Sequence, residues 1–154
     1  MPISSRAVFN AIAVRCGTVP YATAYYGAVG RPVPGAAVPA DPPTKSSIDL
    51  RTAPYLVVFP SSPAAGPDEA LCDDLLGSGR LTVQVTCVAG DVEDLLALID
   101  RVDAALCGWT PVVVGVLCGR LRRPEGFNPP VLTDRAFTPE RLYAPLQFQF
   151  TAHI

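Results

Sequence analysis

Two segments of the chain carry apolar residues at helical spacing. In the first, Ser4 or Ser5 can cap a helix that ends at Gly17, with four apolar residues on one face: Val8, Phe9, Ile12 and Ala13. In the second, Asp91 caps a helix that runs to Cys107 and stops at Gly108. Its apolar stripe is formed by Val92, Leu95, Leu96, Ile99, Val102 and Leu106. The pattern therefore predicts two amphipathic helices.

Strands are predicted where apolar residues alternate with polar ones or form a short β-branched run. The residues from Leu81 to Ala89 alternate with period two, as do those from Leu142 to Ile154, which indicates strands with one buried and one wet face. Pro54 to Pro60 is an aromatic and β-branched run closed by prolines, typical of a buried strand. Two further strands are predicted, over Ala22 to Gly27 and Val112 to Arg122.

The predicted order is helix, three strands, helix and two strands. This order favours an α+β fold, a single mixed or antiparallel sheet of about four to five strands packed against two helices on one face. The 154 residues are enough for one domain, so we expect 1–154 to be a single folded unit.

A proline-rich segment interrupts this pattern. Between Arg31 and Arg51 no periodicity holds, and connections this long are usually functional or disordered. The segment is either a mobile arm or a surface that docks on another subunit, and we favour an arm over about 31–53. A second Pro/Gly-rich loop runs from Ser61 to Gly79, with a helical turn predicted from Asp68 to Leu76.

Composition narrows the classes of function. Hydrophobic residues make up 49% of the chain and charged residues 17%, against about 25% in an average soluble protein, which indicates self-association or a partner. A net charge of −2 provides no basic field for generic nucleic-acid binding. Five cysteines without a CxxC pair predict reduced thiols, with Cys107 and Cys118 in the core. No apolar run reaches the roughly 20 residues that span a bilayer, so no membrane partner is predicted.

The sequence contains few of the residue patterns that catalysis requires. The chain has one histidine, His153, on the polar face of the last predicted strand, and no GxSxG motif. The adjacent carboxylates Asp73-Asp74 and Glu93-Asp94 point to different sides of a helix and do not converge on a metal. Gly77-Ser78-Gly79 precedes a strand, whereas a phosphate-binding loop follows one. We therefore predict no catalytic, cofactor-binding or metal-binding residue, and a protein that is not an enzyme.

Several of these stretches together resemble a known family. An N-terminal helix is followed by Tyr25-Tyr26-Gly27, the arm, Pro54-Tyr55-Leu56-Val57-Val58-Phe59, Leu81-Thr82-Val83-Gln84-Val85-Thr86, the helix Asp91 to Cys107, and Leu146-Gln147-Phe148-Gln149-Phe150. Across nearly the whole chain this order is similar to the tail-terminator, or tail-completion, minor proteins of long-tailed bacteriophages.

The resemblance implies a structural protein of the virion, assembled in the host cytoplasm. It implies a ring, of six copies by expectation, that caps the head-proximal end of the tail tube and stops tube polymerisation. The partners implied are further copies of the chain, the tail tube protein and a head-completion or connector protein. DNA would pass through the channel without specific binding.

Two sets of residues are candidates for these contacts. The densest basic feature lies around the loop from Arg120 to Arg141, where interleaved acidic residues favour a salt-bridged contact between subunits over a phosphate site. The candidates for this ring contact are Arg120, Arg122, Arg123, Asp134 and Arg135. The candidates for axial contacts to tube or connector, in the arm and the following loop, are Arg31, Lys45, Arg51, Asp68 and Glu69.

Two alternatives stay open at this stage. Another phage neck component, such as a head-closure or connector subunit, would share the size and the α+β plan. A small α+β module that binds or converts a small molecule is the other alternative, and it requires a convergent polar pocket.

Overall fold

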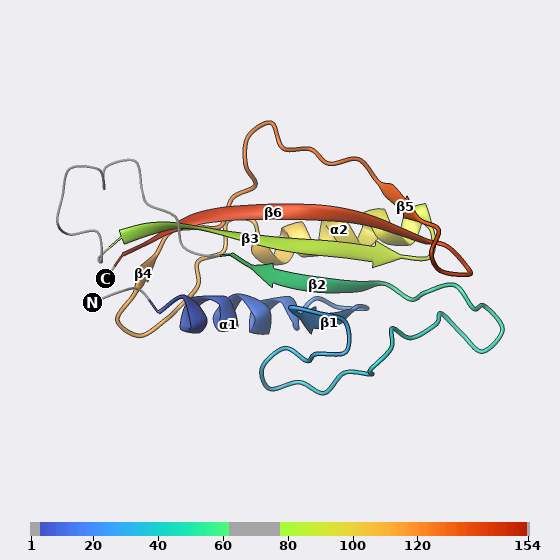
Figure 1. The fold of residues 1–154 in the computed structure, drawn as a ribbon. Helices are drawn as coiled ribbons and strands as arrows, with labels where there is room; N and C mark the ends of the chain where they lie inside the picture. Colours follow the sequence, from blue (N-terminus) through green and yellow to red (C-terminus); the bar gives the residue numbers. More distant parts are fainter. Residues whose placement is uncertain (1–3, 62–77, 154) are drawn as a thin grey trace.

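One mixed sheet, covered by two helices on one of its faces, makes up the body of the molecule (Figure 1). The computed structural model describes residues 4–61 and 78–153. Along the chain the elements are α1 (Ser5–Cys16), β1 (Thr23–Tyr26), β2 (Tyr55–Pro60), β3 (Ser78–Ala89), α2 (Val92–Leu106), β4 (Leu117–Cys118), β5 (Leu132–Asp134) and β6 (Arg141–His153). The predicted α+β class, with two helices on one face of a mixed sheet, is confirmed.

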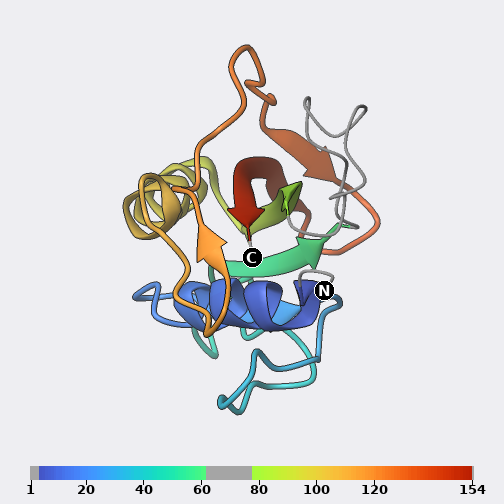
Figure 2. The same cartoon turned by 90° about the vertical axis from the view of Figure 1, so that its left-hand side faces the viewer.

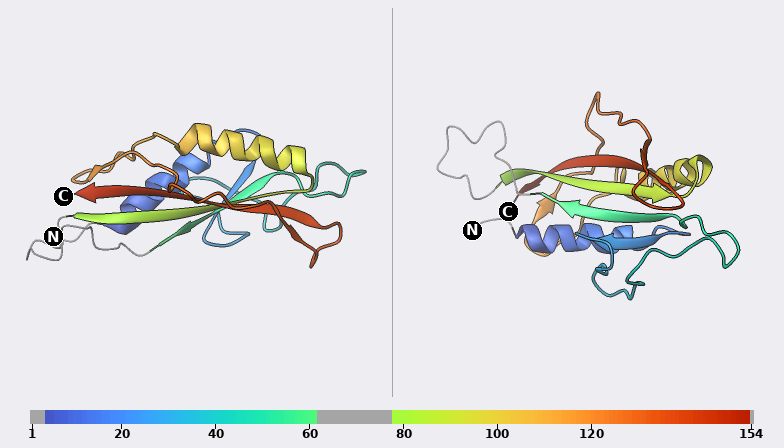
Figure 3. Two further views of the ribbon diagram at one scale, coloured as in Figure 1. Left: turned by 90° about the horizontal axis from the view of Figure 1, so that it is seen from above. Right: turned by 45° about the vertical axis from the view of Figure 1, so that its right-hand side comes forward.

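The sheet is built around the long antiparallel pair β3 and β6, which Figure 2 shows close to end-on. Their register runs from Ser78 opposite His153 to Ala89 opposite Leu142. The strand order is β1-β2-β3-β6-β4, and β5 pairs with the same outer edge of β6 as β4 does. β2 is antiparallel to β3, whereas β1 is parallel to β2. Figure 3 shows how strongly the two long strands twist along their length.

The period-two pattern of β3 and β6 explains which face the helices cover. Val83 lies opposite Phe148, and both side chains are fully buried beneath the helices. Their neighbours Gln84 and Gln147 are also paired, but on the other face, where they are partly exposed. Burying a phenylalanine side chain is worth about 1.5–3 kcal/mol, so a slip by one residue would be heavily penalised. The apolar alternation thus sets the register.

Both helices are capped as their sequences predict. The Ser4 hydroxyl accepts the amide of Ala7 in α1 at 3.4 Å, and the Asp91 carboxylate accepts the amide of Asp94 in α2 at 2.8 Å. α1 buries the four predicted residues and Cys16. The stripe predicted for α2 was wrong in part, because Val92 and Leu96 are half exposed. The buried residues of α2 are Leu95, Leu98, Val102 and Leu106, one face at spacings of three and four.

The strand predicted from Val112 to Arg122 is mostly wrong. Only Leu117–Cys118 pairs with β6 as a strand, and Arg122 forms a single bridge with Gln149. Upstream, Val113 and Val116 bridge around Gly115, whose φ of +78° is left-handed, so the chain turns back on itself. The short strand β5 was not predicted, since it lies in the loop from Arg120 to Arg141, which contains four prolines.

The two cysteines predicted to be core residues differ in the structure. Cys118 is half-buried and packs against the core, whereas Cys107 is exposed, which corrects the prediction for that residue. Cys107 follows the last buried residue of α2, Leu106, and caps the helix end, where its side chain leaves the apolar stripe. No helix in the described ranges is long and apolar enough to cross a membrane.

The arm is the crossover between β1 and β2. Parallel neighbours need a connection of a dozen or more residues, and here the proline-rich segment provides it in place of the usual helix. It lies against its own domain: Val33 is buried in the core, and the Tyr25 hydroxyl donates to the carbonyl oxygen of Pro39 at 3.1 Å. Further on, Thr44 bridges to Thr52. The arm therefore folds back on the subunit that carries it. The helical turn predicted from Asp68 to Leu76 lies outside the described residues.

Candidate functional site

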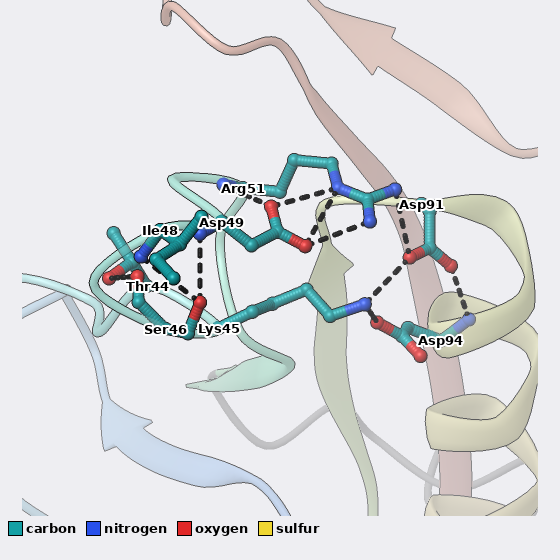
Figure 4. A network of polar contacts seen from close by, with 8 residues as sticks. All are labelled: Thr44, Lys45, Ser46, Ile48, Asp49, Arg51, Asp91 and Asp94. Carbon is teal, nitrogen blue, oxygen red and sulfur yellow. Dashed lines mark hydrogen bonds and ion pairs between the residues drawn. The ribbon is translucent and has the colours of Figure 1, made fainter.

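A cluster of ion pairs ties the arm to the start of α2 (Figure 4). Lys45 Nζ lies 3.0 Å from Asp91 Oδ2 and 2.7 Å from Asp94 Oδ2, and Arg51 Nη1 lies 3.5 Å from Asp91 Oδ2. Arg51 also forms a bidentate ion pair with Asp49, in which Nε donates at 3.0 Å and Nη2 at 2.8 Å. We call Lys45, Asp49, Arg51, Asp91 and Asp94 the arm anchor. It joins segments more than forty residues apart in the chain.

The charges of the arm anchor suit its place at a helix N-terminus. The Asp94 amide, followed by the Lys45 ammonium, holds the pKa of Asp91 below its usual range, and the two carboxylates raise the pKa of Lys45. Hydrogen bonds from Arg51 lower the pKa of Asp49 to about 2. Carboxylates also interact favourably with the helix dipole at this end. Lys45, Asp49, Arg51 and Asp91 are therefore ionised at neutral pH.

Backbone packing beside the arm anchor requires a glycine. Gly90 donates its amide to the carbonyl oxygen of Thr52 at 3.0 Å. A Cβ at position 90 would lie 2.7 Å from Cβ of Arg51 and 3.0 Å from both N and O of Thr52. Thr52 is itself buried. The end of the arm thus passes directly over the residue before the α2 cap, at a distance that only glycine permits.

The tip of the arm is a tight turn that presents apolar side chains. The Ser46 hydroxyl accepts the amides of Ile48 at 3.2 Å and Asp49 at 2.8 Å, and the Ser46 amide donates to the Asp49 carbonyl at 3.1 Å. Ile48 is 93% exposed, and Leu50 is 61% exposed. We call 46–50 the arm tip. Lys45 and Arg51, predicted to contact tube or connector, fasten the arm tip to its own subunit.

A second exposed apolar feature lies at the opposite end of the sheet. The turn around Gly115 directs Val113 and Val116 onto the core, and directs Val112, Val114 and Leu117 into solvent. Val112 is 89% exposed and Val114 fully so. We call 112–117 the apolar loop. It carries no charge, and β4 holds its C-terminal side against β6.

The sheet face opposite the helices contains an apolar groove at one end. Its volume is about 200 Å³, and its lining residues are Tyr55, Val57, Phe59, Thr86, Val88, Asp134, Arg141 and Tyr143. Beside it, Tyr25 and Tyr55 meet edge to face with ring centroids 5.8 Å apart. Arg141 Nη1 donates to the Tyr55 hydroxyl at 3.3 Å, and its guanidinium lies 3.7 Å from the centroid of the Phe137 ring. We call this feature the sheet groove.

The residues predicted for the ring contact do not form one patch. Arg123 turns inward, where its Nη1 lies 3.1 Å from Asp103 Oδ2 of α2. Burial raises the pKa of Asp103, and the Arg123 guanidinium opposes this effect. Arg120 and Arg122 are exposed on the same part of the chain.

The other two candidates lie far from these arginines. Asp134 accepts the amide of Ala136 at 3.0 Å, and Arg135 Nε lies 3.7 Å from Glu140 Oε2 in an exposed pair. Arg122 is opposite Gln149 and Asp134 is opposite Arg141, which places the two groups eight residues of β6, or about 26 Å, apart. The structure therefore separates residues that are neighbours in the sequence.

The outer edge of β6 is open in its middle. β4, the Arg122 bridge and β5 cover the two ends, but no strand of the described chain pairs with 144–148 on that side. Gln149 directs its backbone outward to Arg122, so by alternation Gln147 and Pro145 are the residues whose backbone also faces outward. Pro145 has no amide to donate there, which makes the open edge a poor template for strand addition.

Three predicted axial residues remain. The Arg31 side chain is exposed, and its backbone closes the turn after β1 through bonds to Tyr26 and Ala28. Asp68 and Glu69 lie outside the described residues. Within the described ranges, no three or more histidine, cysteine, aspartate or glutamate side chains group where they could hold a metal ion.

Sequence reasoning missed the exposed valines and the sheet groove. The run from Val112 to Arg122 was predicted as a strand, but Gly115 within it is also the signal for a turn. The sheet groove has no comparable signal, because its lining comes from strands paired at long range. A scan against protein-family models finds no match to the chain, and a search of curated proteins finds none either.

Proposed function

We propose that this chain is a structural subunit of a bacteriophage tail that resembles a tail terminator. Copies of it would form a ring, of six by expectation, on the head-proximal end of the tail tube, stop tube polymerisation and join the tail to head-completion proteins. The observation that carries the proposal is the placement of two exposed apolar features, the apolar loop and the arm tip, at opposite ends of one domain.

A ring subunit needs such a division of its surface. One surface must bind the next copy, and another must bind an axial partner above or below the ring. Within a cyclic ring each copy contacts its two neighbours head to tail, so the ring contacts by themselves already use two different patches of each copy. The apolar loop and the arm tip lie on separate, well-held turns, so one can be occupied without displacing the other.

The low charge of the chain suits this assignment. A subunit that buries its flanks against neighbours needs fewer charged residues than a free monomer, and 17% is well below the average. The sheet face opposite the helices carries uncharged side chains over much of its length, among them Thr82, Gln84, Gln147 and Gln149. Such a face, on an acidic chain, would let DNA slide past without neutralising its phosphates.

Small-molecule binding has less support from the residues that the structure describes. The sheet groove has a volume of about 200 Å³, and two other surface hollows measure about 290 Å³ and 210 Å³. Pockets for small ligands usually enclose about 300–1,000 Å³ and bury most of the ligand. These three hollows are smaller than that, and a protein side chain fits them better than a metabolite does.

The first test is the solution mass by light scattering over a concentration series, with the same samples imaged in negative stain. We expect a ring with a central hole and six times the 16.2 kDa mass of one chain. The second test adds the chain to polymerising tail tube protein from the same particle and measures tube lengths by electron microscopy. Capping would shorten the tubes and place density at one end of each.

The outcomes separate the alternatives. A chain that binds head-side proteins while tubes grow to full length would be a head-closure or connector subunit instead. A chain that stays monomeric alone but caps tubes would be a terminator whose ring assembles on the tube. A monomer that neither caps tubes nor binds them would refute the proposal.

A further inference from the structure

The apolar loop and the sheet groove are both apolar. The loop is exposed, whereas the groove walls Tyr55 and Val57 keep only 5% and 4% of their surface and Val38 of the arm packs beside them. Val112 and Val114 expose almost their whole side chains to solvent. The sheet groove offers aromatic and aliphatic walls from Tyr55, Val57 and Tyr143. Exposed apolar surface of this kind marks an interaction site in proteins that are otherwise polar outside.

The volumes of the two features agree. An apolar cavity of about 150 Å³ can hold benzene, a molecule of six carbons. The sheet groove, at about 200 Å³, therefore has room for the six carbons of two valine isopropyl groups. The loop from 112 to 117 carries no charge. The groove lining carries two, Asp134 and Arg141, and the Arg141 guanidinium is held at the Tyr55 hydroxyl at 3.3 Å. Arg120, just after the apolar loop, has the sign opposite to Asp134 at the groove, where Asp134 shares the lining with Arg141.

One copy of the chain cannot make this contact with itself. Leu117 is paired with His153, and the groove residue Tyr143 lies ten residues earlier in β6, a separation of about 33 Å. The two features also lie on opposite sides of the sheet. In Figure 3 (left) the orange segment that contains the apolar loop is on the same side as α2, whereas the groove opens on the face away from the helices.

We infer that the apolar loop of one copy inserts Val112 and Val114 into the sheet groove of the next copy. The contact joins two different patches, so it is head to tail, and its repetition closes a ring when the rotation between copies divides a full turn. The inference rests on the proposed function, for which it supplies the contact between ring subunits. It assigns that contact to apolar side chains instead of the arginines.

Aspartate substitutions test the contact with a matched control. V114D places a charge where the contact would bury an isopropyl group, and I48D makes the same change at the equally exposed arm tip. Both side chains are solvated in the monomer, so we expect both variants to fold with unchanged circular dichroism and Tm. We expect V114D to weaken self-association by about tenfold or more, and I48D to change it by less than about twofold.

Disulfide trapping tests the head-to-tail geometry. In a background where Cys72, Cys107 and Cys118 are serine, V114C and T86C are prepared as separate variants and as one doubly substituted chain. Mild oxidation should link V114C to T86C in the mixture, and should leave each variant alone largely monomeric on a denaturing gel. The double variant should give a ladder of covalent oligomers that ends at the number of copies in the ring.

The results distinguish this inference from the function on which it rests. A ring that persists in V114D, or a V114C variant that links to itself as readily as to T86C, overturns the contact and leaves the ring function standing. A chain that is monomeric at every concentration and does not cap tubes overturns both the contact and the function. Where a monomer caps tubes, the V114C to T86C cross-link is sought in the ring on the tube, and its absence there overturns the contact alone. Loss of the ring in I48D as well as in V114D would show that the effect is not specific to the apolar loop.

Discussion

Asp91 has two roles that can be separated by substitution. One carboxylate oxygen accepts the amide of Asp94 at 2.8 Å and caps α2, and the other receives Lys45 Nζ at 3.0 Å and holds the arm. D91A removes both interactions. D91N keeps the cap, because asparagine caps a helix about as well as aspartate, but removes the charge. K45M removes the ammonium group and leaves the cap untouched.

The cap provides the larger share of the expected effect. Replacing a capping aspartate by alanine costs about 1 kcal/mol, within a range of about 0.5–2 kcal/mol. The side chains of Lys45 and Asp91 are 29% and 27% exposed, and pairs that water and salt can reach add little to global stability because they are screened. D91A should therefore lower the free energy of unfolding by about 1 kcal/mol, whereas D91N and K45M should each lower it by much less.

Urea unfolding followed by the fluorescence of Trp109, the one tryptophan of the chain, measures these differences. The slope of free energy against urea should be unchanged, since all variants fold to the same structure. Amide exchange of Gly90, which donates to Thr52, then reports on the arm and should accelerate in all three variants. Equal loss of stability in D91N and D91A would refute the division of roles, as would a D91A variant as stable as the parent chain.

Three further outcomes are expected. G90A should lose about 1–3 kcal/mol of stability, because its Cβ meets Arg51 and the arm backbone at 2.7–3.0 Å, and thermal unfolding measures the loss. Folding lowers the pKa of Asp49 to about 2 and also lowers the pKa of Asp91. The two carboxylates therefore stabilise the folded arm above about pH 4, and this stabilisation is lost as the pH falls toward 2. Amide exchange of the arm, measured between pH 6 and pH 2, should accelerate over the same range. With an alkylating reagent at pH 8, mass spectrometry should show exposed Cys107 modified in the native protein, while Cys16, buried and with its pKa raised to about 12, reacts only after unfolding.

Local periodicity predicted the elements that keep the same face buried and the same face in solvent along their whole length. The alternation in β3 and β6 reflects one face beneath the helices and one in solvent, so the pattern can be read without knowing the partner strand. The stripe of α2 was harder, because Leu96 and Leu98 are both apolar and only packing decides between them. The helix turns Leu98 onto the sheet and leaves Leu96 half exposed.

Long-range pairing accounts for most of what the sequence did not predict. The parallel pair of β1 and β2 follows from the arm crossing back along the sheet, and no local signal distinguishes this from an antiparallel hairpin. The arginines were grouped because they lie near one another in the chain. In the structure Arg122 lies opposite Gln149 and Asp134 lies opposite Arg141, so the β6 residues between Arg141 and Gln149 separate the two groups of candidates.

The arm anchor lies beside the start of α2 and the apolar loop beside β4, near opposite ends of the sheet, so within one copy changes at one should not alter the other. Residues that lie well beyond about 10 Å and share no partner usually contribute independently to stability and binding. Lys45 contacts α2 at its start, whereas the apolar loop is held by β4 at the far end of the sheet. A variant that combines K45M with V114D should therefore show the exchange rates of the first change and the self-association of the second. Coupling beyond about 0.5 kcal/mol between the two would mean that the ends of the domain communicate, and that the arm participates in the contact between copies.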